Sequence, residues 1–136
     1  MKISEPELAY RVFKSLESTR SVIYCQRFIP NAAKDIRILF VGDRSFAVRR
    51  SNSSSWMSNA SQGGTGTEYE PTAEELELAW RAAQSVEGTI VGVDLIEDPE
   101  GQLMVLEVNA VPGWQLLQKV TGFDIAEEIV QYLGRQ

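Results

Sequence analysis

Two apolar segments in the C-terminal half of the chain constrain its fold most. Residues 89–96 and 103–109 are rich in Val, Ile and Leu, and the turn sequence Asp-Pro-Glu-Gly lies between them at 98–101. β-Branched residues favour strands, and a Pro/Gly cluster between two such runs favours a hairpin. The sequence therefore predicts a pair of antiparallel strands.

Polar side chains interrupt both predicted strands. Asp94 lies in the first, and Glu107 and Asn109 lie in the second. A buried carboxylate needs a cation, hydrogen bonds or water. If the loop is 98–101, Asp94 lies opposite Val105 and diagonal to Glu107, roughly 7–8 Å away on the same face. A loop one residue shorter would put the two carboxylates on opposite faces.

The three side chains form a candidate metal site. Two carboxylates and an amide are hard oxygen ligands that suit Mg²⁺ or Mn²⁺ and do not suit zinc. On spacing alone, solvated residues at a sheet rim are the commoner explanation. The tight turn at 110–114, directly after Asn109, favours the metal site.

Three segments combine a capping-box pattern with apolar residues at helical spacing, so we expect helices over about 5–17, from Thr72 to Gly88 and from Asp124 to Gly134. The expected caps are Ser4 with Glu7, Thr72 with Glu75, and Asp124 with Glu127. The expected buried stripes are Leu8, Val12 and Leu16; Leu76, Ala79, Ala83 and Val86; and Ile125, Ile129, Val130 and Leu133.

Three further strands are expected in the N-terminal half, over residues 21–29, 35–41 and 45–50, the last two joined at Gly42 and Asp43. The single cysteine, Cys25, is expected to be buried in the first. Residues 51–67, rich in Ser, Asn, Gly and Thr, suggest either a flexible surface loop or one that places backbone N–H groups near an anion. The order αβββαββα predicts an α+β domain, an antiparallel sheet packed against helices.

Composition excludes several functions. With 136 residues the chain fits one domain. Its 19 acidic and 13 basic residues, net charge −6, argue against general nucleic-acid binding. The absence of histidine excludes His-ligated zinc and Ser-His-Asp catalysis. One cysteine and no long apolar run favour the cytoplasm and no membrane partner, and a homo-oligomer stays open.

Several blocks resemble a known family. VGVDLIED, LMVLEVNAVPGW and TGFDIAEEIV are similar to the C-terminal signature of the ATP-grasp superfamily, and most of all to RimK-like carboxylate–amine ligases, which include glutamate ligases. YCQRFIP resembles the family's adenine-receiving hinge, DIRILFVGD its next strand, and WMSNASQGG the loop before its last long helix. The likeness, from about residue 21 to the end, implies the C-terminal lobe of the ATP-grasp fold.

The resemblance also implies roles for single residues. The nucleotide would contact Gln26, Arg27, Phe28, Ile29, Asp35, Ser58, Asn59 and Leu106. Arg37 and Asn59 would face the phosphates or the transferring phosphoryl group, and Asp94, Glu107 and Asn109 would hold one or two Mg²⁺ (or Mn²⁺) ions.

The implied reaction forms an amide from a carboxylate substrate and an amine, with glutamate as the expected amino-acid substrate. ATP first converts the carboxylate to an acyl-phosphate, and the amine then displaces phosphate. Positioning and electrostatics carry most of the rate in such chemistry. Nothing before residue 21 resembles the family's N-terminal domains, so we expect a lobe of a longer enzyme, inactive alone.

Departures from the family pattern leave alternatives open. Family members often have Glu in place of Arg27 and Arg in place of Met57 and Gln62. Arg49 and Arg50 either compensate or are solvated strand-end charges. The chain could also be a non-catalytic ATP-grasp remnant that binds or oligomerises, or an unrelated α+β domain with a rim Ca²⁺ site.

Overall fold

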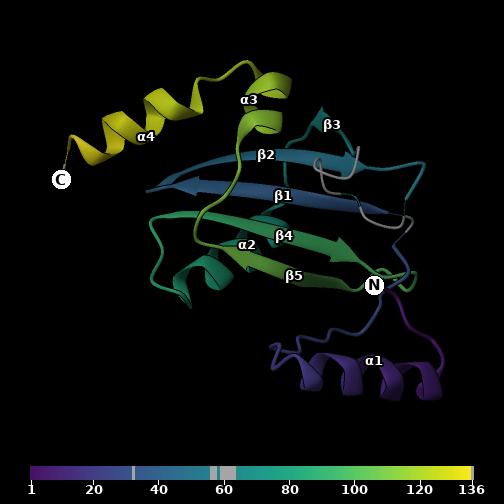
Figure 1. Ribbon diagram of the computed structural model, residues 1–136. Coiled ribbons are helices and arrows are strands. Elements are labelled where there is room, and N and C mark those ends of the chain that lie inside the picture. Colours follow the sequence, from purple (N-terminus) through teal and green to yellow (C-terminus); the bar gives the residue numbers. More distant parts are fainter. Residues whose placement is uncertain (32, 56–57, 59–63, 136) are drawn as a thin grey trace.

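The computed structural model describes residues 1–31, 33–55, 58 and 64–135. Within these residues a five-stranded antiparallel sheet has the order β3-β2-β1-β4-β5 (Figure 1). The strands are β1 (Lys34–Val41), β2 (Arg44–Ser51), β3 (Thr65–Glu68), β4 (Ile90–Glu97) and β5 (Leu103–Asn109). The helices are α1 (Pro6–Ser18), α2 (Ala73–Gln84), α3 (Gln115–Thr121) and α4 (Ile125–Leu133). The predicted α+β class and antiparallel sheet are confirmed.

Helices cover the two faces of the sheet differently. Helix α2 packs on one face, and α3 and α4 lie over part of the other (Figure 1). Because side chains alternate along a strand, β1 contributes to both cores. The α2-face core includes Ile36, Ile38, Phe40, Ala79, Ala83, Val91, Val93 and Leu95. The core under α3 and α4 includes Leu39, Val41, Phe46, Val48, Leu117 and Ile125.

Local signals predicted most of these elements correctly. Strands β1 and β2 form the expected hairpin, with Val41 paired to Arg44 across the turn. Thr72 and Glu75 form the predicted capping box at α2. The Asp124 side chain accepts a hydrogen bond from the Glu127 N–H at the start of α4. Each of these features depends on residues close in sequence.

The hairpin turn requires glycine at position 42, which gives a stability prediction. Gly42 has φ +62°, and a Cβ there would overlap the Tyr132 ring. Gly122 has φ +73° with nothing within 4 Å of an added Cβ, so it isolates the backbone effect. We expect Gly122→Ala to lower the free energy of unfolding by about 1–2 kcal/mol and Gly42→Ala to lower it further, in denaturant melts. Equal losses would show that the Tyr132 ring moves aside freely.

The N-terminal part of the chain differs from the prediction. Residues 21–29 form no strand, and Cys25 is exposed instead of buried. The segment leads from α1 to the sheet, and a strand forms only where another strand accepts its backbone hydrogen bonds. Helix α1 lies apart from the sheet and buries none of its residues (Figure 1). Its N-cap is Glu5 without a side-chain bond, so the capping box at Ser4 was wrong; Pro6 begins the helix.

Two short elements were not predicted, and some expected core positions are exposed. Strand β3 overlaps the end of the expected loop 51–67, and α3 follows the turn at 110–114. Val86, Val130 and Leu133 are exposed, at 50%, 69% and 56%. Val86 follows the end of α2, and α4 contacts its core through Ile125 with Ile129 packed beside it. Helical spacing alone does not show how far a helix overlaps its sheet.

Candidate functional site

The pairing of β4 with β5 puts Asp94 directly opposite Glu107. The expected pairing with Val105 was wrong, since Val105 pairs with Leu95. Glu97 pairs with Leu103, so the loop is one residue longer than expected, and an irregularity between Asp94 and Leu95 adds a second shift. One shift alone would have separated the carboxylates, but two shifts return them to one face.

Asp94 is buried in a network with two arginines. Arg37, its cross-strand partner on β1, donates from Nε to Oδ1 at 2.7 Å and from Nη2 to Oδ2 at 2.8 Å. Arg50 Nη2 also donates to Asp94 Oδ2, at 2.7 Å. Arg50 in turn binds its own cross-strand partner, Asp35, with Nε at 2.6 Å from Oδ1 and Nη2 at 2.9 Å from Oδ2. The Ser58 hydroxyl donates to Asp35 as well.

The environment of Arg50 shows that its side chain holds this network together. Its side chain is 4% exposed. Burial acts to lower the pKa of Arg50, but the hydrogen bond to Asp35 and the charges of Asp94 and Asp35 outweigh burial and raise it. Arg50 is therefore not a solvated strand-end charge. Its neighbour Arg49 lies over the Tyr69 ring at 4.0 Å and makes no contact with this network.

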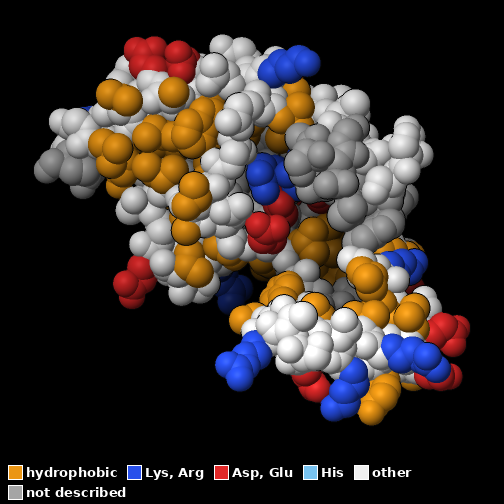
Figure 2. All heavy atoms as spheres, viewed as in Figure 1, with side chains coloured by type: hydrophobic (Ala, Val, Ile, Leu, Met, Phe, Trp, Pro, Cys, Tyr) orange, Lys and Arg blue, Asp and Glu red, His pale blue; other side chains and the backbone are white. Residues whose placement is uncertain are grey.

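A cavity of about 580 Å³ lies beside the network. Figure 2 shows the surface hollowed between the sheet and α1, with basic and acidic side chains together beside the hollow. Of the residues expected to contact nucleotide, seven line it: Gln26, Arg27, Phe28, Ile29, Asp35, Ser58 and Leu106. Asp94 and Glu107 line it too. Asn59, Met57 and Gln62 lie outside the described residues.

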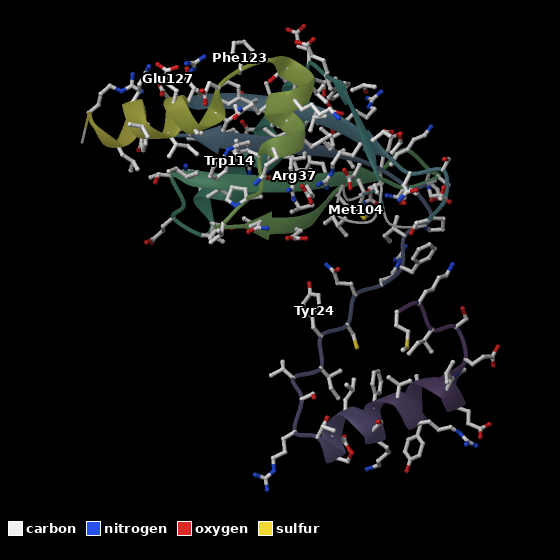
Figure 3. All side chains as sticks on the ribbon, turned by 45° about the horizontal axis from the view of Figure 1, so that its top comes forward. Tyr24, Arg37, Met104, Trp114, Phe123 and Glu127 are labelled. Atoms are coloured by element: carbon white, nitrogen blue, oxygen red, sulfur yellow. The ribbon has the colours of Figure 1, made fainter. Side chains whose placement is uncertain are left out.

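The segment that failed to form a strand supplies one wall of this cavity. Gln26 Nε2 donates to the Leu106 carbonyl at 3.0 Å, which ties the segment to β5. Tyr24 projects from it below the sheet, whereas Arg37 lies on the sheet near Trp114 (Figure 3). The cavity therefore has a wall from Tyr24 and residues 26–29 and a floor from side chains of β1, β2, β4 and β5.

Glu107 and Asn109 lie at the rim of the site. Asn109 Nδ2 donates to Glu107 Oε1 at 3.3 Å, and Asn109 Oδ1 accepts from the Val111 N–H at 2.9 Å. The turn that follows packs against β4, where a Cβ at Gly92 would meet Pro112 at 2.8 Å. Arg37 and Asn109 do not line the cavity, but each contacts a carboxylate that does.

Comparison with known proteins now identifies the fold. Residues 7–133 match the RimK-like ATP-grasp domain. The chain belongs to this family.

Named relatives of this RimK-like domain are glutamate ligases. It is 33% identical over 123 residues to the tetrahydromethanopterin:alpha-L-glutamate ligase of Methanococcus maripaludis, covering 88% of this chain and 42% of that protein. It is 36% identical over 132 residues to a probable alpha-L-glutamate ligase of Citrobacter koseri, covering 95% of this chain and 44% of the relative. The chain thus spans less than half the length of these relatives.

Solved ATP-grasp ligases share the fold. The macrocyclase MdnB from Microcystis aeruginosa matches 98% of this chain and 46% of its own, with a TM-score of 0.61 and 18% identity. The ligase PsnB, complexed with a precursor variant, Mg and ADP, matches 76% of this chain and 32% of its own, with a TM-score of 0.60 and 21% identity.

The donors present in this RimK-like domain suit a hard cation. Among the described residues, no three Asp, Glu, Cys or His side chains converge on one point. Instead, Asp94 and Glu107 are cross-strand partners on the neighbouring strands β4 and β5, and Asn109 adds an amide oxygen. Asp94 is compensated by arginine, whereas Glu107 forms no ion pair within the part of the chain that the structure describes. The oxygen donors and this uncompensated carboxylate fit Mg²⁺ chemistry.

The sequence did not predict that Arg50 would join Asp35 to Asp94 at the centre of this network. The available signal was its position: Asp35, Arg37, Arg50 and Asp94 all fall on one sheet face once β1 is paired with β2 and β4. It also missed the N-terminal residues Met1 to Ser4, which line the cavity although α1 lies apart from the sheet; Lys2 Nζ sits 3.7 Å from the Phe28 ring centroid. No local pattern in the sequence pointed to this contact.

No helix among the described residues has the length and apolarity needed to cross a membrane.

Proposed function

We propose that this chain is the metal- and nucleotide-binding C-terminal lobe of a longer ATP-dependent carboxylate–amine ligase whose amino-acid substrate is glutamate. The observation that carries the proposal is the cavity, which gathers seven residues expected at nucleotide together with Asp94 and Glu107. These residues come from three distant parts of the chain. A chance surface hollow would have no reason to collect them.

The cavity walls suit a nucleotide. Phe28 and Leu106 offer apolar surface for a base, and Gln26, bound to the Leu106 carbonyl, holds the segment against β5. Backbone groups of residues 26–29 supply the polar contacts, so the change to Arg27 is tolerated. Asp35, which also lines the cavity, would approach the ribose.

Asp94, Glu107 and Asn109 would hold Mg²⁺ at the end of this cavity. Bound there, the ion supplies charge stabilisation for the terminal phosphates. Arg37, beside Asp94, supplies a second positive charge for the transferring phosphoryl group. No histidine is needed for this chemistry.

The proposed reaction has two steps. A carboxylate oxygen attacks the γ-phosphorus of ATP and ADP leaves, which gives an acyl-phosphate. The amine of glutamate then attacks the acyl carbon, and phosphate leaves as the amide forms. The chain covers 42% to 44% of its curated relatives, so the remaining lobes supply the other phosphate contacts and the substrate sites.

One observation favours a second candidate, a non-catalytic remnant. Asp94 already makes three hydrogen bonds to arginines, which compensate its charge without metal. A remnant that lost its nucleotide would keep such a network for stability alone. The two candidates differ in whether Mg-nucleotide binds.

Calorimetry with ADP tests the proposal directly. We expect ADP with Mg²⁺ to bind the protein, and EDTA to weaken its Kd by at least about tenfold, equivalent to about 1.4 kcal/mol. A loss of ADP affinity in EDTA would indicate that a metal ion contributes to binding. An affinity unchanged by EDTA would remove the metal from the proposal. Absence of binding at millimolar Mg-ADP would support the remnant.

A further inference from the structure

The carboxylate of Asp94 has little room for a cation as it stands. Arg37 occupies both of its oxygens, and Arg50 shares Oδ2. An ionised carboxylate offers about four acceptor positions, and three are taken. A cation that binds Asp94 with both oxygens must displace one of the arginines.

The two arginines are held unequally. Arg50 bridges Asp35 and Asp94 through three short hydrogen bonds and is 4% exposed. Among the described residues, Arg37 contacts a single carboxylate, and it also donates to the Gly113 carbonyl at 3.4 Å; its side chain is 15% exposed. Removing Arg50 from Asp94 would also strain its pairing with Asp35, whereas Arg37 can leave by breaking its two bonds to Asp94 and the long contact to the Gly113 carbonyl.

The charge balance points the same way. Asp35, Asp94 and Glu107 carry three negative charges, and Arg37 with Arg50 carries two positive ones, so the group is nearly neutral. Without Arg37 the group has two excess negative charges, which match one divalent cation. In a partly buried site such an excess of negative charge is weakly screened. Binding of the cation and departure of Arg37 therefore favour each other.

We infer that Arg37 is the exchangeable counterion of Asp94: a divalent cation arriving with nucleotide takes its place, and the guanidinium turns to the phosphates, while Arg50 stays as the positioning residue. This rests on the proposed nucleotide function. The two arginines that share the Asp94 carboxylate would then have different roles.

Nuclear magnetic resonance of the two arginine Nε–H groups tests the exchange. Each Nε–H donates to a carboxylate, Arg37 to Asp94 at 2.7 Å and Arg50 to Asp35 at 2.6 Å, so each gives a protected signal. We expect saturating Mg-ADP to shift or broaden the Arg37 signal and to leave the Arg50 signal in place. Arg50 is thus an internal control within one sample.

The outcomes separate this inference from the proposed function. If calorimetry shows Mg-ADP binding while the Arg37 signal stays unchanged, the exchange is wrong and the nucleotide site stands. If the Arg50 signal moves instead, the roles assigned here are reversed. If nothing binds and neither signal moves, both the function and the exchange fail.

A variant gives an independent readout without nucleotide. In Arg37→Met, the counterion that competes for Asp94 is gone, so Mn²⁺ alone should bind about tenfold or more tightly than in the wild type. Electron paramagnetic resonance of free Mn²⁺ measures this. Mg-ADP, which needs the guanidinium at its phosphates, should bind less tightly to the same variant. Equal Mn²⁺ affinity in the two proteins would overturn the inference.

Discussion

Replacing Arg50 with methionine is expected to lower the free energy of unfolding by about 3–5 kcal/mol, the range for breaking a buried ion pair. The reason is burial: Asp35 and Asp94 are 4% exposed, and Arg50 supplies hydrogen bonds to both. Methionine would leave Asp35, buried on the central strand, without its arginine, so that only the Ser58 hydroxyl would remain of its described side-chain partners. Urea melts followed by circular dichroism measure the change.

The adjacent arginine is the matched control for that variant. Arg49 is on the same strand, is exposed and lies over the Tyr69 ring, so Arg49→Met should cost about 1 kcal/mol or less. Adding Asp35→Asn to Arg50→Met removes the stranded charge, so the double variant should lose less than the sum of the single losses. Similar losses for both arginines would show that the network contributes little beyond ordinary surface packing.

In the proposed full-length ligase, replacing Glu107 with glutamine is expected to reduce amide formation by at least about 100-fold, because the phosphates would lose part of the charge that stabilises them. The side chain is exposed and its described contact is a 3.3 Å bond from Asn109, so stability should change by less than about 0.5 kcal/mol. ATP-dependent phosphate release with glutamate and acceptor measures the rate, and unfolding of the same sample measures the fold.

Glu100→Gln controls for the loss of one acidic charge from the same hairpin. Glu100 lies exposed in the turn between β4 and β5. It does not line the cavity and is not a member of the ion-pair network. Its replacement should leave the rate within about twofold, since a surface charge on a turn contributes little. Near-normal turnover in Glu107→Gln would remove Glu107 from the site, whereas equal losses in both variants would indicate a general effect of net charge.

The register of the β4–β5 hairpin shows the limit of sequence reasoning here. The two apolar runs and the turn between them predicted both strands correctly, and the loop was misjudged by one residue. The irregularity beside Asp94 then shifted the pairing again, so the right residues met through a pairing that the pattern did not predict. Bulges depend on the packing of both strands, and no single-strand periodicity encodes them.

Residues 21–29 also show that local sequence composition does not determine tertiary structure. Their β-branched and aromatic composition is typical of a strand, and the family likeness assigned four of them, residues 26–29, to the nucleotide. Strand composition failed as a structural prediction, since residues 21–29 form no strand, and Cys25 and Tyr24 are exposed. The likeness led to residues that do line the cavity, which no propensity would have found.

By itself, the sequence determined what short-range chemistry controls: the capping box of α2, the hairpin at Gly42, and alternation that splits β1 between two cores. Only the tertiary structure decided that Arg37 and Arg50 compensate Asp94, because that contact joins β1 and β2 to β4 across a sheet whose order departs from chain order. Caps and alternation act within a few residues. Charge pairing depends on which strands become neighbours, and that is settled by the packing of the whole sheet.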